Sequence, residues 1–151
     1  MQTPQFLIDN EFALRKIINY IILALENEII MKICVIDDNV EILELLKNVL
    51  EATGNEVSTA DNGKDGLSLI LRDKFELTIL DITMPEFSGI DIVRYLDSND
   101  RLRDTPIIFL TAASIPDSEM EKWMEKGVKV YMNKPVEFND LFERVMEVKM
   151  A

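Results

Sequence analysis

The stretch of residues 77–89 reads LTILDITMPEFSG and decides the fold more than any other part of the chain. Its first four residues predict a short buried strand. Asp81 follows directly, and Pro85 and Gly89 indicate a structured loop before the next helix. In open parallel sheets, ligands bind outside the carboxyl ends of the strands. The stretch therefore predicts a strand of such a sheet with a functional acid at its end.

Polar residues also follow three other apolar runs. Asp37 and Asp38 come after ICVI, Thr111 after IIFL, and Lys134 after VKVYM and one asparagine. The carboxyl ends of parallel strands share one edge of a sheet, so these side chains are expected to converge with Asp81. Oxygen-only ligands favour Mg²⁺, which commonly binds one or two carboxylates together with phosphate oxygens. The set therefore indicates a divalent metal beside a phosphoryl group.

Each of these residues also has a purely structural interpretation. Asp38 can be the N-cap of the next helix, with Glu41 completing a capping-box-like pattern. Asp37 can be a solvated turn acid, Thr111 an ordinary strand residue and Lys134 a surface lysine. The order and spacing of all of them together favour the functional interpretation.

Tyr131 and Pro135 flank Lys134 and add to the pattern. X-Pro bonds are where cis peptides occur, and a cis bond before Pro135 is expected to aim the lysine into the site. Tyr131 is either ordinary core packing or a side chain that moves between solvent and core.

From Met31 onward, short β-favouring runs alternate with helical patterns, which is typical of an α/β domain with a parallel sheet. Right-handed crossovers place helices on both faces of such a sheet. The domain is expected to span residues 31–151. Strands are expected near 32–36, 56–60, 76–80, 106–110 and 128–132, and helices near 39–53, 63–73, 88–97, 117–126 and 137–149.

Residues 1–30 form an extension outside this pattern and predict an amphipathic helix. Three accounts of it stay open. Met31 is the true start, or the helix dimerises or docks on a partner, or it packs on its own domain. Its apolar stripe consists of Leu14, Ile18, Ile21, Leu25 and Ile29, widened by Ile17, Tyr20 and Ile22.

Composition excludes several classes of function. The net charge of -12 argues against nucleic acid as a direct partner. The chain has no histidine, so a phosphoryl donor based on phosphohistidine must be another protein. One cysteine, Cys34, excludes an internal disulfide and is typical of a reducing cytoplasm. No apolar run reaches the roughly 20 residues of a membrane span.

With these motifs assembled, the chain from about Met31 onward resembles the receiver domain of response regulators, the CheY-like family. The resemblance implies a flavodoxin-like, doubly wound (βα)5 fold, with five parallel strands in the order 2-1-3-4-5. The N-terminal helix is an addition to it. The resemblance also implies that Asp81 accepts a phosphoryl group, and that Asp37, Asp38, Asp81 and the backbone carbonyl of Thr83 bind Mg²⁺.

The family's switch residues are matched by Thr111 and Tyr131, and its lysine by Lys134. A sensor histidine kinase or a phosphotransfer protein is the implied donor. The altered face, formed by the helix 117–126, the last strand and the last helix, is expected to bind a downstream protein. The resemblance thus implies a signalling switch that assists its own phosphorylation and dephosphorylation, not an enzyme. Pro116 departs from the pattern and predicts a late start of the helix 117–126.

Two other functions fit part of the same pattern. The first is an interaction adaptor with the same fold that works without phosphorylation; the intact acids and Lys134 argue against it. The second is a haloacid-dehalogenase-like phosphatase, which also forms an aspartyl phosphate. That family needs an acid two residues after its nucleophile, where this chain has Thr83.

Overall fold

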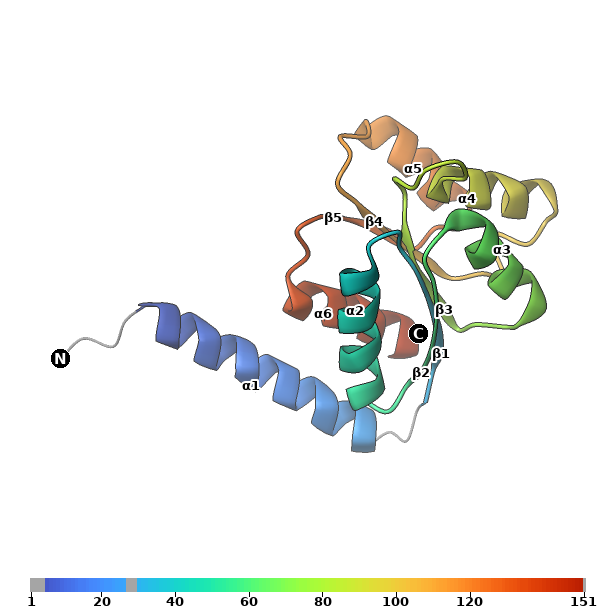
Figure 1. Cartoon of the computed structure of the whole chain (residues 1–151). Coiled ribbons are helices and arrows are strands. Elements are labelled where there is room, and N and C mark those ends of the chain that lie inside the picture. Colours follow the sequence, from blue (N-terminus) through green and yellow to red (C-terminus); the bar gives the residue numbers. More distant parts are fainter. Residues whose placement is uncertain (1–4, 27–29, 151) are drawn as a thin grey trace.

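The computed structural model describes residues 5–26 and 30–150 of the 151-residue chain. Its strands are parallel and lie in the order β2-β1-β3-β4-β5, which confirms the implied topology. Figure 1 shows helices on both sides of the sheet and α1 outside these layers. The elements are α1 (Gln5–Glu26), β1 (Lys32–Ile36), α2 (Val40–Ala52), β2 (Glu56–Ala60), α3 (Gly63–Arg72), β3 (Leu77–Asp81), α4 (Gly89–Ser98), β4 (Ile107–Thr111), α5 (Asp117–Lys126), β5 (Val130–Asn133) and α6 (Phe138–Met150).

Alternate side chains of the strands enter two separate hydrophobic cores. In β1, Ile33 and Val35 pack with side chains of α2 and α6, whereas Cys34 and Ile36 pack with those of α3, α4 and α5. The central strands β3 and β4 are buried along their whole length, because helices cover both faces of the sheet. This two-sided packing fixes the strand ends that carry the candidate site.

The predicted strand boundaries differ slightly from those in the structure. β3 and β4 begin and end one residue later than predicted, and β5 runs over Val130–Asn133 instead of 128–132. The reason is that pairing with neighbouring strands continues past the apolar runs: Asp81 pairs with Leu110, and Thr111 with Asn133. Asp81 and Thr111 are therefore the last residues of their strands, fixed by the sheet itself.

The helix ends correct one interpretation and confirm another. Asp38 as the cap of α2 is wrong, because the Oδ1 of Asn39 accepts the N–H groups of Glu41 and Ile42 at 3.0 and 3.2 Å. Asp38 lies one residue before that cap. The late start of α5 is confirmed, since Pro116 precedes its first residue and provides no side-chain cap.

The N-terminal helix predicted for residues 1–30 is present as α1, which contacts α6. Lys16 Nζ lies 3.1 Å from Glu143 Oε1 on α6. Ile29 and the side chains of Ile17 and Tyr20 lie outside the described residues. Of the helices in the described part of the chain, none combines the length and the hydropathy needed to cross a membrane.

Candidate functional site

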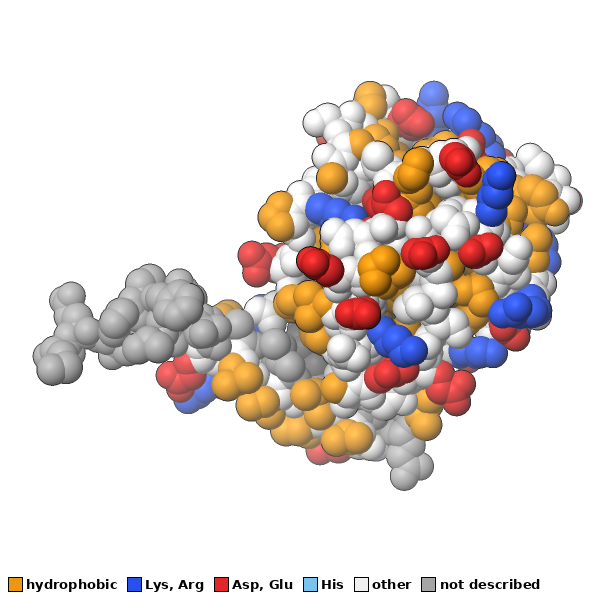
Figure 2. All heavy atoms as spheres, in the orientation of Figure 1, with side chains coloured by type: hydrophobic (Ala, Val, Ile, Leu, Met, Phe, Trp, Pro, Cys, Tyr) orange, Lys and Arg blue, Asp and Glu red, His pale blue; other side chains and the backbone are white. Residues whose placement is uncertain are grey.

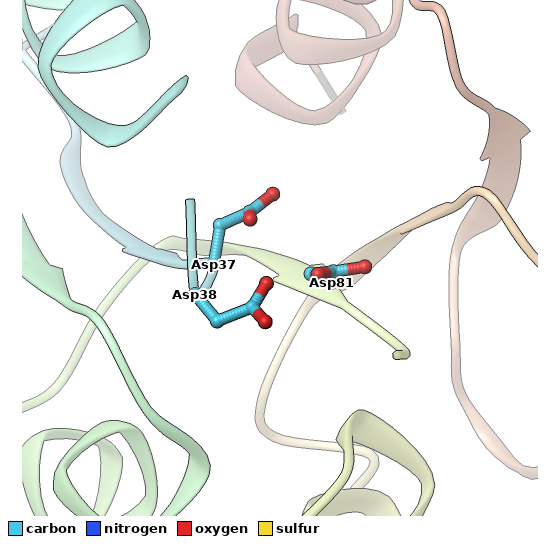
Figure 3. Close-up of side chains that lie close together, drawn as sticks. All are labelled: Asp37, Asp38 and Asp81. Carbon is cyan, nitrogen blue, oxygen red and sulfur yellow. The ribbon is translucent and has the colours of Figure 1, made fainter. Parts of the chain in front are cut away.

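Three carboxylates from two strand ends meet at the carboxyl edge of the sheet. Asp37 and Asp38 follow β1, Asp81 ends β3, and these two strands are neighbours. One oxygen from each residue lies within 4.8 Å of the others, and Figure 3 shows the side chains approaching one another from the two strands. Asp37 and Asp81 are buried, whereas Asp38 is exposed. The cluster is therefore accessible to solvent on the side of Asp38.

Lys134 brings a positive charge to this cluster from the loop after β5. Its Nζ lies 2.6 Å from Asp37 Oδ2 and 3.5 Å from Asp81 Oδ2. Its backbone N–H donates to the carbonyl oxygen of Thr111 at 2.7 Å. The peptide bond between Lys134 and Pro135 is cis, as the sequence suggested. One ammonium against three carboxylates leaves the cluster acidic.

The environment of Asp81 opposes its ionisation. Burial raises the pKa of Asp81 to about 6, and the negative charge of Asp37 also raises it. The charge of Lys134 acts in the opposite direction, as does the N–H of Thr83, which lies 3.3 Å from Asp81 Oδ1. Clustered carboxylates of this kind are stabilised by a cation among them. An all-oxygen set of Asp37, Asp38 and Asp81 fits Mg²⁺.

The two predicted switch residues form hydrogen bonds away from the acids. Thr111 is buried at the end of β4, and its Oγ1 accepts the N–H of Ala113 at 3.0 Å. Tyr131 lies on β5, and its Oη donates to Asp117 Oδ1 at 2.7 Å. Among the described residues, no hydrogen bond joins Thr111 or Tyr131 to Asp81. The structure thus unites Lys134 with the acids and leaves both switch residues with local partners.

Two residues that contribute to the site's surroundings were missed in the sequence. A side chain at Gly89 would overlap the carbonyl oxygen of Asp81 and lie 2.9 Å from the Cα of Ile82, so only glycine lets α4 begin beside the site. In the sequence, Gly89 indicates only a structured loop after Asp81. Asp117, the partner of Tyr131, is 14 residues away on another element. Nothing in the sequence pattern pairs these two side chains.

Comparison with known proteins gives a consistent result. Residues 33–146 match the family described as the response regulator receiver domain. The polar-differentiation response regulator DivK of Brucella anthropi is 29% identical over 113 residues, which cover 75% of this chain and 91% of DivK. The probable transcriptional regulatory protein SilR of Salmonella typhimurium is 36% identical over 115 residues, but these cover only 49% of SilR.

Solved structures show the same fold. The response regulator TrrA of Thermotoga maritima, in complex with Mg²⁺ and BeF, is 35% identical with a TM-score of 0.67, over 78% of this chain and 97% of that one. The Francisella response regulator 1452 receiver domain is 28% identical with a TM-score of 0.71, over 80% and 97% of the two chains. In both cases the likeness spans nearly all of the solved chain.

Proposed function

The chain belongs to the response regulator receiver domain family, which signals by phosphorylation, and from this premise we propose that Asp81 is its phospho-acceptor. One observation carries the proposal. The buried carboxylate of Asp81 lies with those of Asp37 and Asp38 in one cluster, with Lys134 Nζ 3.5 Å away. A receiver needs these groups together at the edge of the sheet, because the transferred group is itself strongly negative.

A carboxylate oxygen of Asp81 attacks the phosphorus atom of the donor. The bond between phosphorus and the donor's nitrogen or oxygen breaks, and an acyl phosphate forms on Asp81. The donor is the phosphohistidine of a sensor kinase or a phosphotransfer protein, since this chain contains no histidine. Lys134, already 3.5 Å from Asp81, pairs with the new phosphoryl oxygens.

Mg²⁺ is the metal proposed for this site. The carboxylates of Asp37, Asp38 and Asp81 and the backbone carbonyl of Thr83 would hold it, and it supplies positive charge beside the transferred group. Two observations support this choice. The donor set contains only oxygen, and the pKa of Asp81 is raised first by burial and then by the negative charge of Asp37, which a cation among the acids would counter.

The output of the switch is a change of the face formed by α5, β5 and α6. Thr111 exchanges its bond with Ala113 for one with the phosphoryl group, and Tyr131 moves into the space that Thr111 leaves. A downstream protein binds the altered face. Coupling of this kind is typically worth about 1–3 kcal/mol, so phosphorylation shifts a population of states and is not an absolute switch.

The N-terminal helix α1 is proposed to pair with a second copy of the chain. Leu14, Ile18, Ile22 and Leu25 are exposed on it at spacings of three and four residues, and Figure 2 shows hydrophobic side chains in a row along the described part of this helix. Lys16, on the opposite side by helical periodicity, bonds to α6. The exposed row thus points away from α6, and it forms an apolar stripe along one face of the helix that a second helix would cover.

The phospho-acceptor assignment is tested by the intact mass of the full chain after incubation with acetyl phosphate, with and without Mg²⁺. A gain of one phosphoryl group that requires Mg²⁺ and is absent from Asp81→Asn is the expected result. Phosphorylation of Asp81→Asn at the wild-type rate would refute the assignment. If the wild-type chain neither gains a phosphoryl group nor binds Mg²⁺, the adaptor that works without phosphorylation is the better description.

A further inference from the structure

The hydroxyl of Tyr131 is held at the molecular surface by a residue outside the phosphorylation site. The ring of Tyr131 packs against the core beneath α3, α4 and α5, and its partner across the sheet is the fully buried Phe109. Its Oη donates to Asp117 Oδ1 at 2.7 Å, and Asp117 is exposed. A hydrogen bond to an ionised acceptor is stronger than one between neutral groups. The bond therefore favours the conformation in which the hydroxyl lies outward.

Asp117 also ties α5 to the sheet. It is the first residue of this helix, and within α5, which is described in full, only Met120 is buried. At the other end of the helix, Lys126 Nζ lies 2.6 Å from Asp97 Oδ2 of α4. Met120 and the partly buried Trp123 pack α5 on the core, and the two polar contacts add one link at each end of the helix. Loss of the hydrogen bond between Asp117 and Tyr131 releases the N-terminal end of α5, which follows the loop after Thr111.

Both ends of the segment between Thr111 and α5 are thus bonded to predicted switch residues. Ala113 bonds to the hydroxyl of Thr111, and Asp117 bonds to the hydroxyl of Tyr131. An inward movement of Tyr131 takes its Oη away from Asp117, so that bond exists in only one of the two states. A contact made in only one state shifts the equilibrium toward that state.

We propose that Asp117 is a positioning residue that latches Tyr131 outward and thereby sets how strongly this chain is biased toward its unphosphorylated state. The inference rests on the proposed receiver function and extends it, since it assigns a regulatory role to a side chain that touches neither the metal nor the phosphoryl group. Removal of the latch lets the phosphorylated state form more readily.

The experiment measures the dissociation constant of beryllofluoride, used as a phosphoryl analogue with Mg²⁺, for the full chain by the fluorescence of its single tryptophan, Trp123. Asp117→Ala is expected to bind about two- to five-fold more tightly than the wild type, in keeping with one hydrogen bond near the surface. Glu119→Ala is the matched control. It also removes an acid from the first turn of α5 and keeps the bond to Tyr131, so its dissociation constant stays at the wild-type value.

Two further readouts separate a latch from a general loosening of α5. In the background of Tyr131→Phe, Asp117→Ala has no further effect, because the bond is already absent. The hydrogen bond to Asp117 is also the main reason that the pKa of Tyr131 is raised. In Asp117→Ala, the pKa of Tyr131 therefore falls toward its ordinary value, measured by NMR of ring-labelled tyrosine.

Each remaining outcome overturns the proposal. Unchanged affinity in Asp117→Ala means that the bond does not bias the switch. A gain that persists in the Tyr131→Phe background, or that Glu119→Ala reproduces, assigns the effect to helix α5 alone. A wild-type chain that fails to bind beryllofluoride refutes the receiver function and the latch together. If only the role of Asp117 is wrong, the wild-type chain still binds beryllofluoride.

Discussion

The surroundings of Asp81 disfavour the ionised form of its carboxyl group in the unphosphorylated chain. Its pKa in the folded chain is about 6, against an ordinary value of 3.8, chiefly because of burial and Asp37. This group therefore favours the folded state fully below about pH 4, and that contribution is lost as the pH rises toward 6. Above pH 6, the ionised carboxylate of Asp81 lowers the free energy of unfolding by at most about 3 kcal/mol.

We therefore expect Asp81→Asn to be more stable than the wild type at pH 7.5 without Mg²⁺, by about 1–3 kcal/mol. Its advantage shrinks at lower pH and is small near pH 4, where Asp81 is protonated in the folded chain and about half protonated in the unfolded chain. Urea unfolding at a series of pH values measures the difference. An equal advantage at pH 4 and at pH 7.5 would show that the asparagine acts by packing and not by removal of charge.

Lys134 allows a comparison of two ion pairs of equal length. Lys134 lies 2.6 Å from Asp37 with both side chains largely buried, and Lys126 lies 2.6 Å from Asp97 at the surface. Lys134→Ala leaves two buried acids without their cationic partner and is expected to lower the free energy of unfolding by about 3 kcal/mol without Mg²⁺. Lys126→Ala is expected to lower it by less than about 1 kcal/mol.

Mg²⁺ distinguishes these two variants further. Added Mg²⁺ should recover part of the stability lost in Lys134→Ala, because it supplies positive charge to the same acids, and should leave Lys126→Ala unaffected. Urea titrations with and without Mg²⁺ provide the comparison. Equal losses in both variants would mean that the acid cluster does not depend on the lysine.

At the scale of single elements, the start of α2 depends on Asn39. Its side chain accepts two backbone N–H groups of the first turn. Asn39→Ala is expected to lower the free energy of unfolding by about 1 kcal/mol, whereas Asn39→Ser keeps an accepting oxygen and most of the stability. Urea unfolding of the two variants tests this. If serine were no better than alanine, the cap would not be what stabilises this helix end.

The same helix shows where sequence reasoning stopped short. From Met31 onward, alternating apolar runs predicted every strand and helix to within two residues. The position of Asp37, Asp38, Asp81 and Lys134 at strand ends predicted their cluster. Asp38 and Asn39 are both good cap residues, and only the backbone geometry of the turn decides between them. The contact between Tyr131 and Asp117 depends on side-chain directions across two elements, which no spacing encodes.

At the scale of the whole molecule, α1 is the element proposed to join two copies of the chain. Ile18→Glu places a charge in the exposed apolar row and is expected to convert a dimer of the full chain to a monomer in sedimentation experiments. Asn19→Glu is the matched control, since Asn19 is exposed next to the row and not within it. A wild-type chain that sediments as a monomer at all concentrations would rule out pairing through α1.

The single thiol of this chain, Cys34, reports when the centre of the sheet opens to solvent. Cys34 is fully buried in β1, and burial, followed by the charge of Asp73, raises the pKa of its thiol to about 12. The thiolate is the reactive form, so alkylating reagents react with Cys34 only when the centre of the sheet opens. The rate of alkylation then measures how often the native protein unfolds under physiological conditions. A cysteine introduced on the surface would be the one site in the described chain that takes a dye without such opening.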